Sequence, residues 1–458
     1  MQRPTAGTTP TPGRGAGPAL ATTGGLPLPD DLGVDGARLL DRLAALAAVG
    51  DTGDGGNCRL ACTDDDAGGR ELVVGWMREL GLDVRIDRVG NVVGVRDGTE
   101  AGPAVMTGSH IDTVRTGGRY DGTLGVLAGL EVLRTLDDAG IRTRRPLAVA
   151  FFSNEEGARF PPDMLGSLAY AGGITLEEAD AALGIDGTTF GAELARIGWA
   201  GEVPVPGPAP HAFVELHIEQ GPVLEEAGVA IGVVTGVQGI SWRELTLTGE
   251  SNHAGTTPLR LRHDAGLVGA QVAVAVRRIA TVLGGASSQG KGPPNSSMVG
   301  TVGSLRLHPD LVNVVAATAT MTVDLRSTDD DVLAEAERLV AAEVEALAAA
   351  EGVTARWRPL ARFAPVTFDP DVVALVEATA RALGSTTMRL PSGAGHDAQM
   401  LARVCPAGMV FVPSRAGISH NPAEHTDPDQ LVAGADVLLH VLVGLAGIAA
   451  GPPVGAGA

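Results

Sequence analysis

The chain has 458 residues, of which 44% are hydrophobic and 19% are charged. These values are typical of a soluble globular enzyme rather than of a disordered or membrane chain. A formal charge of −20, from 54 acidic and 34 basic residues, leaves no basic surface for a phosphate backbone, so we expect no nucleic-acid partner. One hydrophobic core rarely organises so long a chain, and two domains are therefore expected.

Cysteine content and the two ends of the chain bear on its compartment. Cys58, Cys62 and Cys405 are too few for a disulfide framework, and we expect free thiols in a reducing cytoplasm rather than a zinc site. Residues 1–30 lack the apolar core of a signal peptide and are expected to form a disordered extension, as is the terminal GPPVGAGA. No apolar run approaches the length of a membrane span, so no membrane partner is expected.

From residue 36 onward, predicted helices and strands alternate along the chain. The predicted elements are helices at 36–50 and 69–81, strand-like residues 82–97, a strand at 104–108, a helix at 124–140 and a strand at 147–153. Such alternation predicts an α/β fold with helices around a mainly parallel sheet. In such folds the active-site residues gather in loops after the carboxyl ends of the strands.

The pattern changes between about 236 and 352, where an inserted α+β domain is predicted. Its elements are strands at 241–249, 298–305 and 317–327, with helices at 264–283 and 331–350. The α/β alternation then resumes with a helix at 370–383, a strand at 409–413 and a helix from Asp429. We therefore expect a discontinuous catalytic domain, made of 31–235 and 353–458, and an inserted domain at 236–352.

Two candidate metal-binding segments lie around the strand at 104–108. In GSHIDTV, His110 follows the strand, and the spacing allows the Asp112 carboxylate to hold the other imidazole nitrogen. In GGRYDGTLG, Asp121 precedes a helix among glycines, where its carboxylate could bridge two cations. Each motif has a simpler interpretation, because His-x-Asp is often an ordinary polar loop and an Asp before a helix is often a cap.

Further candidates follow other strands. Glu155 and Glu156 end FFSNEE, where repulsion between adjacent carboxylates calls for a cation or a shared proton, unless the loop is simply solvated. In ELHIEQG a period of two places Glu215, His217 and Glu219 on one side of a strand.

A last candidate ligand, His420, lies in the turn-rich loop GISHNPAEHTDP after a strand, whereas we expect His425 at the surface. Taken with the earlier candidates, His, Asp, Glu, His and His are the ligand types that a pair of zinc-like ions requires.

Read in order, these motifs closely resemble the hydantoinase/carbamoylase family of the aminoacylase and carboxypeptidase G-like metallopeptidase superfamily. The resemblance runs from about residue 36 to 446. It rests on GSHIDTVRTGGRYDGTLGVLAGLEV, NEEGARFPPDMLGS, ELHIEQGPVLE, SNHAGTTP, VNVV, DLRS, GAGHDA and SHNPAEHT. It implies a metallopeptidase-like catalytic domain and an inserted lid domain through which the chain forms a homodimer.

The resemblance also implies a role for each candidate residue. It implies two divalent ions per subunit, each with three ligands, and Asp121 is shared between them. The ligands of one ion would be His110, Asp121 and His217, and those of the other Asp121, Glu156 and His420. Glu155 would be the general base, with Asp112 supporting the ligands. Zinc or manganese is the expected metal, and cobalt or nickel is compatible, because mixed imidazole and carboxylate ligands accept several divalent ions.

Substrate-binding residues are expected in both domains, with some acting across the dimer: Gln220, His253, Asn313, Arg326, Gly395 and His396. An arginine fork can clamp a substrate carboxylate, which makes Arg326 the natural partner of a carboxylate-bearing ureido substrate. A surface ion pair is the simpler interpretation of Arg326. Asp397 is expected beside the pocket or as a helix cap.

The implied activity is hydrolysis of the ureido C–N bond of N-carbamoyl amino acids, of the L-α or β-alanine type, to amino acid, ammonia and carbon dioxide. Glu155 would take a proton from the attacking water and give it to the leaving nitrogen. Allantoate is the alternative substrate. An exopeptidase, or a binding protein without catalysis, remains a further alternative, because the motifs identify the bond type better than the substrate side chain.

Overall fold

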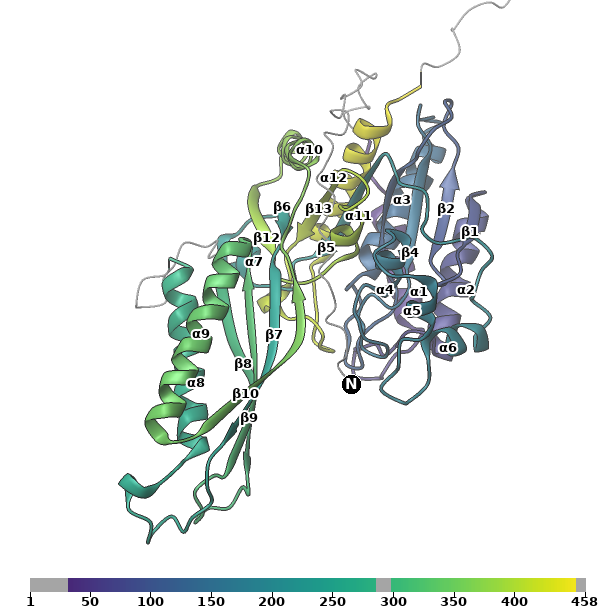
Figure 1. The fold of residues 1–458 in the computed structure, drawn as a ribbon. Coiled ribbons are helices and arrows are strands. Elements are labelled where there is room, and N and C mark those ends of the chain that lie inside the picture. Colours follow the sequence, from purple (N-terminus) through teal and green to yellow (C-terminus); the bar gives the residue numbers. More distant parts are fainter. Residues whose placement is uncertain (1–31, 286–297, 450–458) are drawn as a thin grey trace, which may run out of the picture.

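The computed structural model describes residues 32–285 and 298–449, and two β-sheets organise them (Figure 1). The expected extension at 1–30 and the terminal GPPVGAGA lie outside this range. The three cysteines are free thiols, as expected. One sheet has nine strands and the other has four.

The larger sheet has four parallel strands at its centre, flanked by antiparallel ones. Its strands in spatial order are β1 (Asp83–Ile86), β2 (Val92–Arg96), β4 (Leu147–Phe152), β3 (Val105–His110), β5 (Ala212–Ile218), β13 (Ala407–Val412), β6 (Ile231–Val237) and β11 (Val366–Thr367), with β12 (Thr387–Ser392) also paired to β6. All residues of the four parallel strands, β4, β3, β5 and β13, are buried, as both faces of a parallel sheet require. The α/β expectation is confirmed.

Helices cover both faces of this sheet. Leu216 of β5 lies against Gly434 of α12 (Pro428–Ala446), whereas the neighbouring Glu215 accepts a hydrogen bond from Ala398 N of α11 (Asp397–Leu401). Successive strand residues point to opposite faces, so α12 and α11 lie on opposite sides. The other helices of this unit are α1 (Gly36–Ala47), α2 (Asp64–Glu79), α3 (Thr123–Asp138), α4 (Leu165–Tyr170), α5 (Leu176–Asp180), α6 (Phe190–Arg196), α7 (Val223–Ala227) and α10 (Pro370–Ala382).

The smaller sheet is antiparallel, and two long helices cover one of its faces (Figure 1). Its order is β10 (Thr354–Phe363), β7 (Gly239–Thr248), β9 (Thr318–Ser327) and β8 (Met298–His308), with helices α8 (Ala265–Leu283) and α9 (Asp330–Glu351). Along β9, Met321, Val323 and Leu325 belong to the core beneath the helices. The alternate residues, Asp324 and Arg326, therefore point to the opposite, uncovered face.

The boundary expected at 352/353 needs correction, because β10 belongs to the smaller sheet. It follows α9 directly and pairs with β7 from Thr354↔Thr248 to Phe363↔Ile240. We therefore place the return to the larger sheet after Phe363. The segment TARWRPLARF is a poor strand by pattern because it contains Pro359 and three arginines, which an edge strand tolerates.

Two helices differ from the expectation that no apolar run approaches membrane length. By length and composition, α8 and α12 could each cross a membrane. However, 61% of the apolar window of α12 is buried inside the protein, and the helix packs on α3, β5 and β13. The corresponding buried share for α8 is 39%, and α8 packs on α9 and β8. A buried core helix meets the same criterion, so this finding is weak support for a membrane span.

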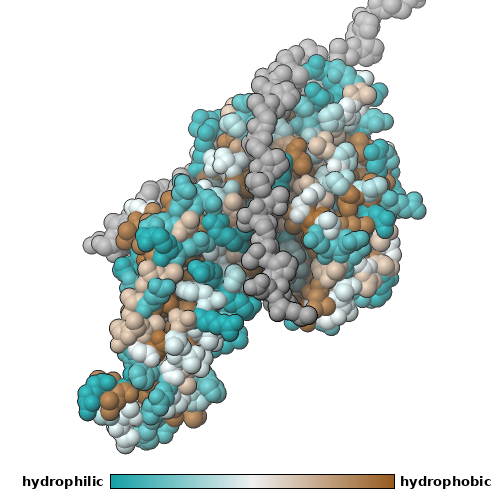
Figure 2. All heavy atoms as spheres, in the orientation of Figure 1, coloured by the Kyte–Doolittle hydropathy of each residue, from teal (hydrophilic) through white to brown (hydrophobic). Residues whose placement is uncertain are grey.

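The far tip of the smaller unit carries exposed hydrophobic side chains (Figure 2). They come from two loops, one before α8 and one between β8 and β9: Leu259, Leu261, Leu311 and Val312. Val312 is fully exposed. Apolar groups concentrated at one place on a surface are typical of a contact site for another protein surface.

A buried ion pair within α2 includes Arg70, whose guanidinium links this helix to the loop after β4 that carries the paired glutamates. Arg70 Nε lies 2.9 Å from Asp66 Oδ2, and both side chains are almost completely excluded from solvent. The same guanidinium donates to the carbonyl of Gly90 at 2.7 Å and to Ser153 Oγ at 3.0 Å. Its charge is thus compensated only by contacts inside the protein.

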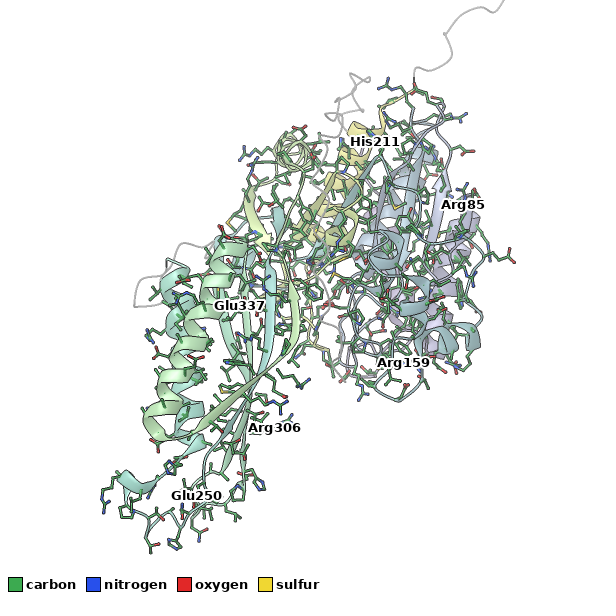
Figure 3. All side chains as sticks on the ribbon, viewed as in Figure 1. Arg85, Arg159, His211, Glu250, Arg306 and Glu337 are labelled. Atoms are coloured by element: carbon green, nitrogen blue, oxygen red, sulfur yellow. The ribbon has the colours of Figure 1, made fainter. Side chains whose placement is uncertain are left out.

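We predict that Asp66→Asn lowers the free energy of unfolding by about 3–5 kcal/mol, because it leaves the buried charge of Arg70 without its counter-ion. Denaturation in urea measures this loss. The matched control is Asp83→Asn, which breaks an exposed pair with Arg85 (Figure 3) and should cost less than about 1 kcal/mol. Equal losses in the two variants would contradict the prediction.

Candidate metal centre

The predicted ligands converge at one edge of the larger sheet. They lie at or after the carboxyl ends of parallel strands: His110 ends β3, Glu155 and Glu156 follow β4, His217 lies near the end of β5, and His420 lies in the loop after β13. Asp121 precedes α3. Parallel strands bring these ends together, although the ligands lie far apart in the sequence.

The carboxylate of Asp121 is the centre of the cluster. Its Oδ1 lies 3.1 Å from His217 Nε2 and 3.5 Å from His110 Nε2. Its Oδ2 lies 3.4 Å from His420 Nε2, which in turn lies 3.2 Å from Glu156 Oε2. The two oxygens of Asp121 therefore face two different sets of ligands, which is the arrangement that a bridging carboxylate requires.

Of the three groups of side chains in the described residues that could hold a cation, two share Asp121. Within each group the ligand atoms lie within 4.8 Å of one another: His110, Asp121 and His217 in one, and Asp121, Glu156 and His420 in the other. Imidazole and carboxylate ligands suit zinc, manganese and related divalent ions. The residues present thus fit the expected metal, and a cation would relieve the repulsion between their carboxylates.

Backbone hydrogen bonds orient two of the imidazoles toward Asp121. His110 Nδ1–H donates to the carbonyl of Asp112 at 2.9 Å, and His217 Nδ1–H donates to the carbonyl of Ile218 at 2.8 Å. Because a carbonyl only accepts, each Nδ1 carries the proton and each Nε2 presents the metal-binding atom.

The expected partner of His110 needs correction. The Asp112 carboxylate lies 4.0 Å from His110 Nδ1, and the backbone carbonyl of the same residue takes its place. The carboxylate instead accepts hydrogen bonds from the backbone N–H groups of Glu155, at 3.2 Å, and Glu156, at 3.4 Å. Asp112 therefore supports the site by holding the loop of the two glutamates beside β3.

Asp121 does not serve as a helix cap. The N-cap of α3 is Gly122, and no side chain caps this helix end. Gly122 has a φ of 65°, and a Cβ at this position would lie 2.4 Å from the ring of His110. Only glycine lets the chain turn into α3 while His110 approaches Asp121.

Burial and charge shift the pKa values of the clustered groups. Burial raises the pKa of Glu155 well above its ordinary value, although His110 opposes the shift. Burial disfavours the charged form of His110, but Glu155 and Asp121 outweigh it and raise the pKa of His110 well above its ordinary value. Hydrogen bonds from His420 to Asp121 and Glu156 raise the pKa of His420 to about 10. Glu155, whose Oε2 lies 3.3 Å from His110 Nε2, thus lies where protons can be exchanged.

The loops around the centre hold two residues in a strained backbone conformation. Gln220 has a φ of 57° and His420 a φ of 54°, in the left-handed region that residues other than glycine rarely adopt. Gln220 Nε2 donates to Asp121 Oδ2 at 2.8 Å, and Ser419 Oγ donates to the same oxygen at 2.9 Å. Strain of this kind concentrates at functional sites.

A cavity of about 190 Å³ opens beside the centre and includes four of the predicted substrate residues in its wall. These are Gln220, Arg326, Gly395 and His396. Arg326 comes from β9 of the smaller sheet, so the cavity lies between the two units. His396 is buried against His217, with ring centroids 4.6 Å apart, and burial lowers its pKa well below the ordinary value.

The structure does not bring His253 and Asn313 into this cavity. Ala254 N donates to the Asn313 carbonyl at 2.9 Å, and His253 bridges to Val314, so the two residues lie together. They belong to the tip loops, near Glu250, which is labelled at the far end of the smaller unit in Figure 3. A role for these residues at a metal centre therefore requires the tip of another subunit.

Several residues at the site were not predicted from the sequence. Asp163, Ile240 and Trp242 line the cavity, and Glu424 accepts hydrogen bonds from the N–H groups of Tyr120 and Asp121. Glu424 lies within the motif SHNPAEHT, so its proximity to His420 in the sequence was a usable signal.

Two other residues take positions that the pattern alone did not distinguish. Glu219 lies just beyond the end of β5, and its carboxylate accepts from Val223 N and Leu224 N at the start of α7. Asp397 is buried next to the cavity residue His396 and begins α11, for which His396 is the N-cap.

Comparisons with known proteins agree with this geometry. Residues 106–443 match the model of peptidase family M20/M25/M40. The chain is 42% identical to an N-carbamoyl-L-amino-acid amidohydrolase of Rhizobium meliloti, over 90% of this chain and 96% of that protein. It is 35% identical to a ureidoglycolate hydrolase of Arabidopsis thaliana, over 91% of this chain and 87% of that protein.

A solved structure extends the agreement to three dimensions. A hydantoinase/carbamoylase family amidase from Burkholderia multivorans superposes with a TM-score of 0.86 at 45% identity, covering 91% of this chain and 98% of that chain. As its motifs predicted, the chain belongs to the hydantoinase/carbamoylase amidases within peptidase family M20/M25/M40.

Proposed function

We propose that the protein is a metal-dependent amidohydrolase that cleaves the ureido C–N bond of N-carbamoyl amino acids. The observation that carries this proposal is the pair of ligand groups sharing Asp121, with Glu155 beside them and Arg326 in the opposite wall of one cavity. The similarity to amidohydrolases named for N-carbamoyl-L-amino acids supports the substrate class.

The proposed ligands are those that the sequence predicted. His110, Asp121 and His217 would hold one divalent ion, and Asp121, Glu156 and His420 a second. When bound, the ions would polarise the scissile carbonyl and lower the pKa of water. Zinc or manganese is the proposed metal, with cobalt or nickel as substitutes.

Glu155 is the proposed general base. Its carboxylate is buried beside the ligands, and burial raises its pKa, which suits a group that accepts a proton and releases it again. Glu155 takes a proton from the attacking water and passes it to the leaving nitrogen. Asp112 keeps Glu155 in place through the backbone hydrogen bond described above.

The substrate carboxylate has a natural partner in Arg326. Its guanidinium is oriented by Asp324 and retains N–H groups that can bind a planar anion. Gln220, Gly395 and His396 complete the proposed binding surface from the larger sheet.

Allantoate is the second candidate substrate. It also carries a ureido group and a carboxylate, and the relatives named as ureidoglycolate hydrolases favour it. Exopeptidase activity and binding without catalysis have weaker support, since the carbamoylase relatives are the more similar proteins and the base and ligands are all present.

A homodimer formed through the inserted unit is the proposed assembly. The outer strand β8 exposes Val299, Leu305 and Leu307, and α8 exposes Val274 and Val282. Within the described residues, one edge of β8 has no neighbouring strand, and exposed apolar groups beside such an edge suit a second copy. The free cysteines support a cytoplasmic location.

The direct test is ammonia release from a panel of substrates in metal-supplemented buffer. The panel contains N-carbamoyl-L-α-amino acids, N-carbamoyl-β-alanine, allantoate and dipeptides. We expect turnover of at least one N-carbamoyl amino acid above that of allantoate, and no turnover of dipeptides. Preferred cleavage of allantoate would select the second candidate, and preferred cleavage of dipeptides would overturn the proposal.

We predict that Glu155→Gln lowers kcat about 10³-fold with unchanged metal content, because the amide cannot accept the proton. Metal analysis and steady-state kinetics measure the two quantities. Glu202→Gln, at an exposed position of the same unit, is the matched control and should retain full activity. Near-normal turnover by Glu155→Gln with bound metal would refute the assignment.

We predict that metal uptake releases protons at pH 7. The pKa values of His110 and His420 lie above their ordinary value, so both imidazoles carry a proton that metal must displace. Metal affinity should therefore fall as the pH is lowered. Calorimetric titration with Zn²⁺ in buffers of different ionisation enthalpy counts the protons, and His211→Ala, at a histidine outside the cluster, should leave the count unchanged. Uptake without proton release would disagree with the shifted pKa values.

A further inference from the structure

The wall of the cavity formed by the smaller sheet contains three side chains from one face of that sheet. Ile240 and Trp242 are two residues apart on β7, so both point to the same face. Ile240 pairs with Arg326 on β9, and Trp242 pairs with Asp324. Ile240, Trp242 and Arg326 all line the 190 Å³ cavity that contains Asp121 and Glu155.

Contacts on this face hold Arg326 in one orientation. Its Nε and Nη2 donate to the Asp324 carboxylate at 3.1 and 2.9 Å, and its Nη1 donates to the Gly393 carbonyl at 2.6 Å. Its Cζ lies 5.7 Å from the ring centroid of Trp242. One N–H on each Nη remains after these bonds.

The indole of Trp242 carries a donor without a partner. Its Nε1 is buried and makes no hydrogen bond with any part of the chain that the structure describes. A buried N–H that stays unpaired is destabilising, so native proteins seldom leave one in that state. An indole N–H can only donate, which means that the missing partner is an acceptor.

We propose that Trp242 contacts the substrate and donates its Nε1–H to the substrate carboxylate beside Arg326. Trp242 and Arg326 then form a two-residue clamp that selects ligands with an anionic group near the scissile bond. An uncharged carboxamide supplies a weaker acceptor and a competing N–H₂ donor, so the clamp disfavours it. The inference rests on the proposed function for the identity of the anion.

The test compares an acid and its amide in the metal-loaded enzyme. Trp242→Phe keeps the aromatic ring and removes the donor. With N-carbamoyl-alanine we expect its KM to rise at least 10-fold while kcat changes less than threefold. With N-carbamoyl-alaninamide, KM should change less than threefold. An equal preference for acid over amide in wild type and Trp242→Phe would overturn the proposal.

The matched control is Trp357→Phe. Trp357 lies on β10 of the same sheet and also stacks with an arginine, Arg243, at 4.4 Å, but it does not line the cavity. Its kinetic constants for both substrates should stay within twofold of wild type. A loss of acid preference in this variant, equal to that in Trp242→Phe, would assign the effect to the sheet as a whole and refute a specific role for Trp242.

Ligand binding separates this inference from the proposed function. If the wild-type enzyme hydrolyses no ureido substrate, the proposed function fails, while calorimetric affinities for the acid and the amide still test the clamp. Should Trp242→Phe fail to fold, tryptophan emission of the wild-type and Trp357→Phe proteins still tests the clamp, because both proteins retain Trp242. Emission should respond to N-carbamoyl-alanine and not to the carboxamide, and an equal response to both, or to neither, would contradict the clamp.

Discussion

The Asp121 carboxylate, shared among three imidazoles, is the constraint on which the site depends. Each of its oxygens faces a different group of ligands, so small displacements of β3, β5 or the loop after β13 would separate one group from the other. Gly122 lets the chain turn beneath His110, and Gln220 and Ser419 hold the second oxygen. Beside this carboxylate, the backbone of Gln220 and His420 lies in the left-handed region that residues other than glycine rarely adopt.

The parallel sheet turns this local requirement into a property of the fold. Four buried parallel strands end at one edge, so Asp121 and His420, which lie 299 positions apart in the sequence, become neighbours there. The buried strands also exclude water from one side of the cluster, and this burial raises the pKa of Glu155, whereas the neighbouring carboxylates outweigh burial and raise the pKa of His110. The same strands therefore position the candidate ligands and form part of the hydrophobic core.

The convergence of the candidate ligands was predictable because most of them lie at or just after the ends of apolar strands, and strand ends of a parallel sheet meet. The hydrogen-bond partner of His110 was not predictable, because spacing cannot distinguish the carbonyl of Asp112 from its carboxylate. Strand β10 was not predicted from the sequence, because an edge strand carries little hydrophobic alternation. Trp242 was not predicted either, because its place in the cavity depends on how the two sheets meet, which no local pattern encodes.

The walls of the cavity come from two different sheets and the loops attached to them. The larger sheet contributes every candidate ligand, and the smaller sheet contributes Ile240, Trp242 and Arg326. Substitutions on the uncovered face of the smaller sheet can alter the fit of a ligand without disturbing the packing beneath the hydrolytic groups. Such modularity offers a physical basis for divergence among relatives: new substrates can be accommodated on one wall while the reaction is inherited on the other.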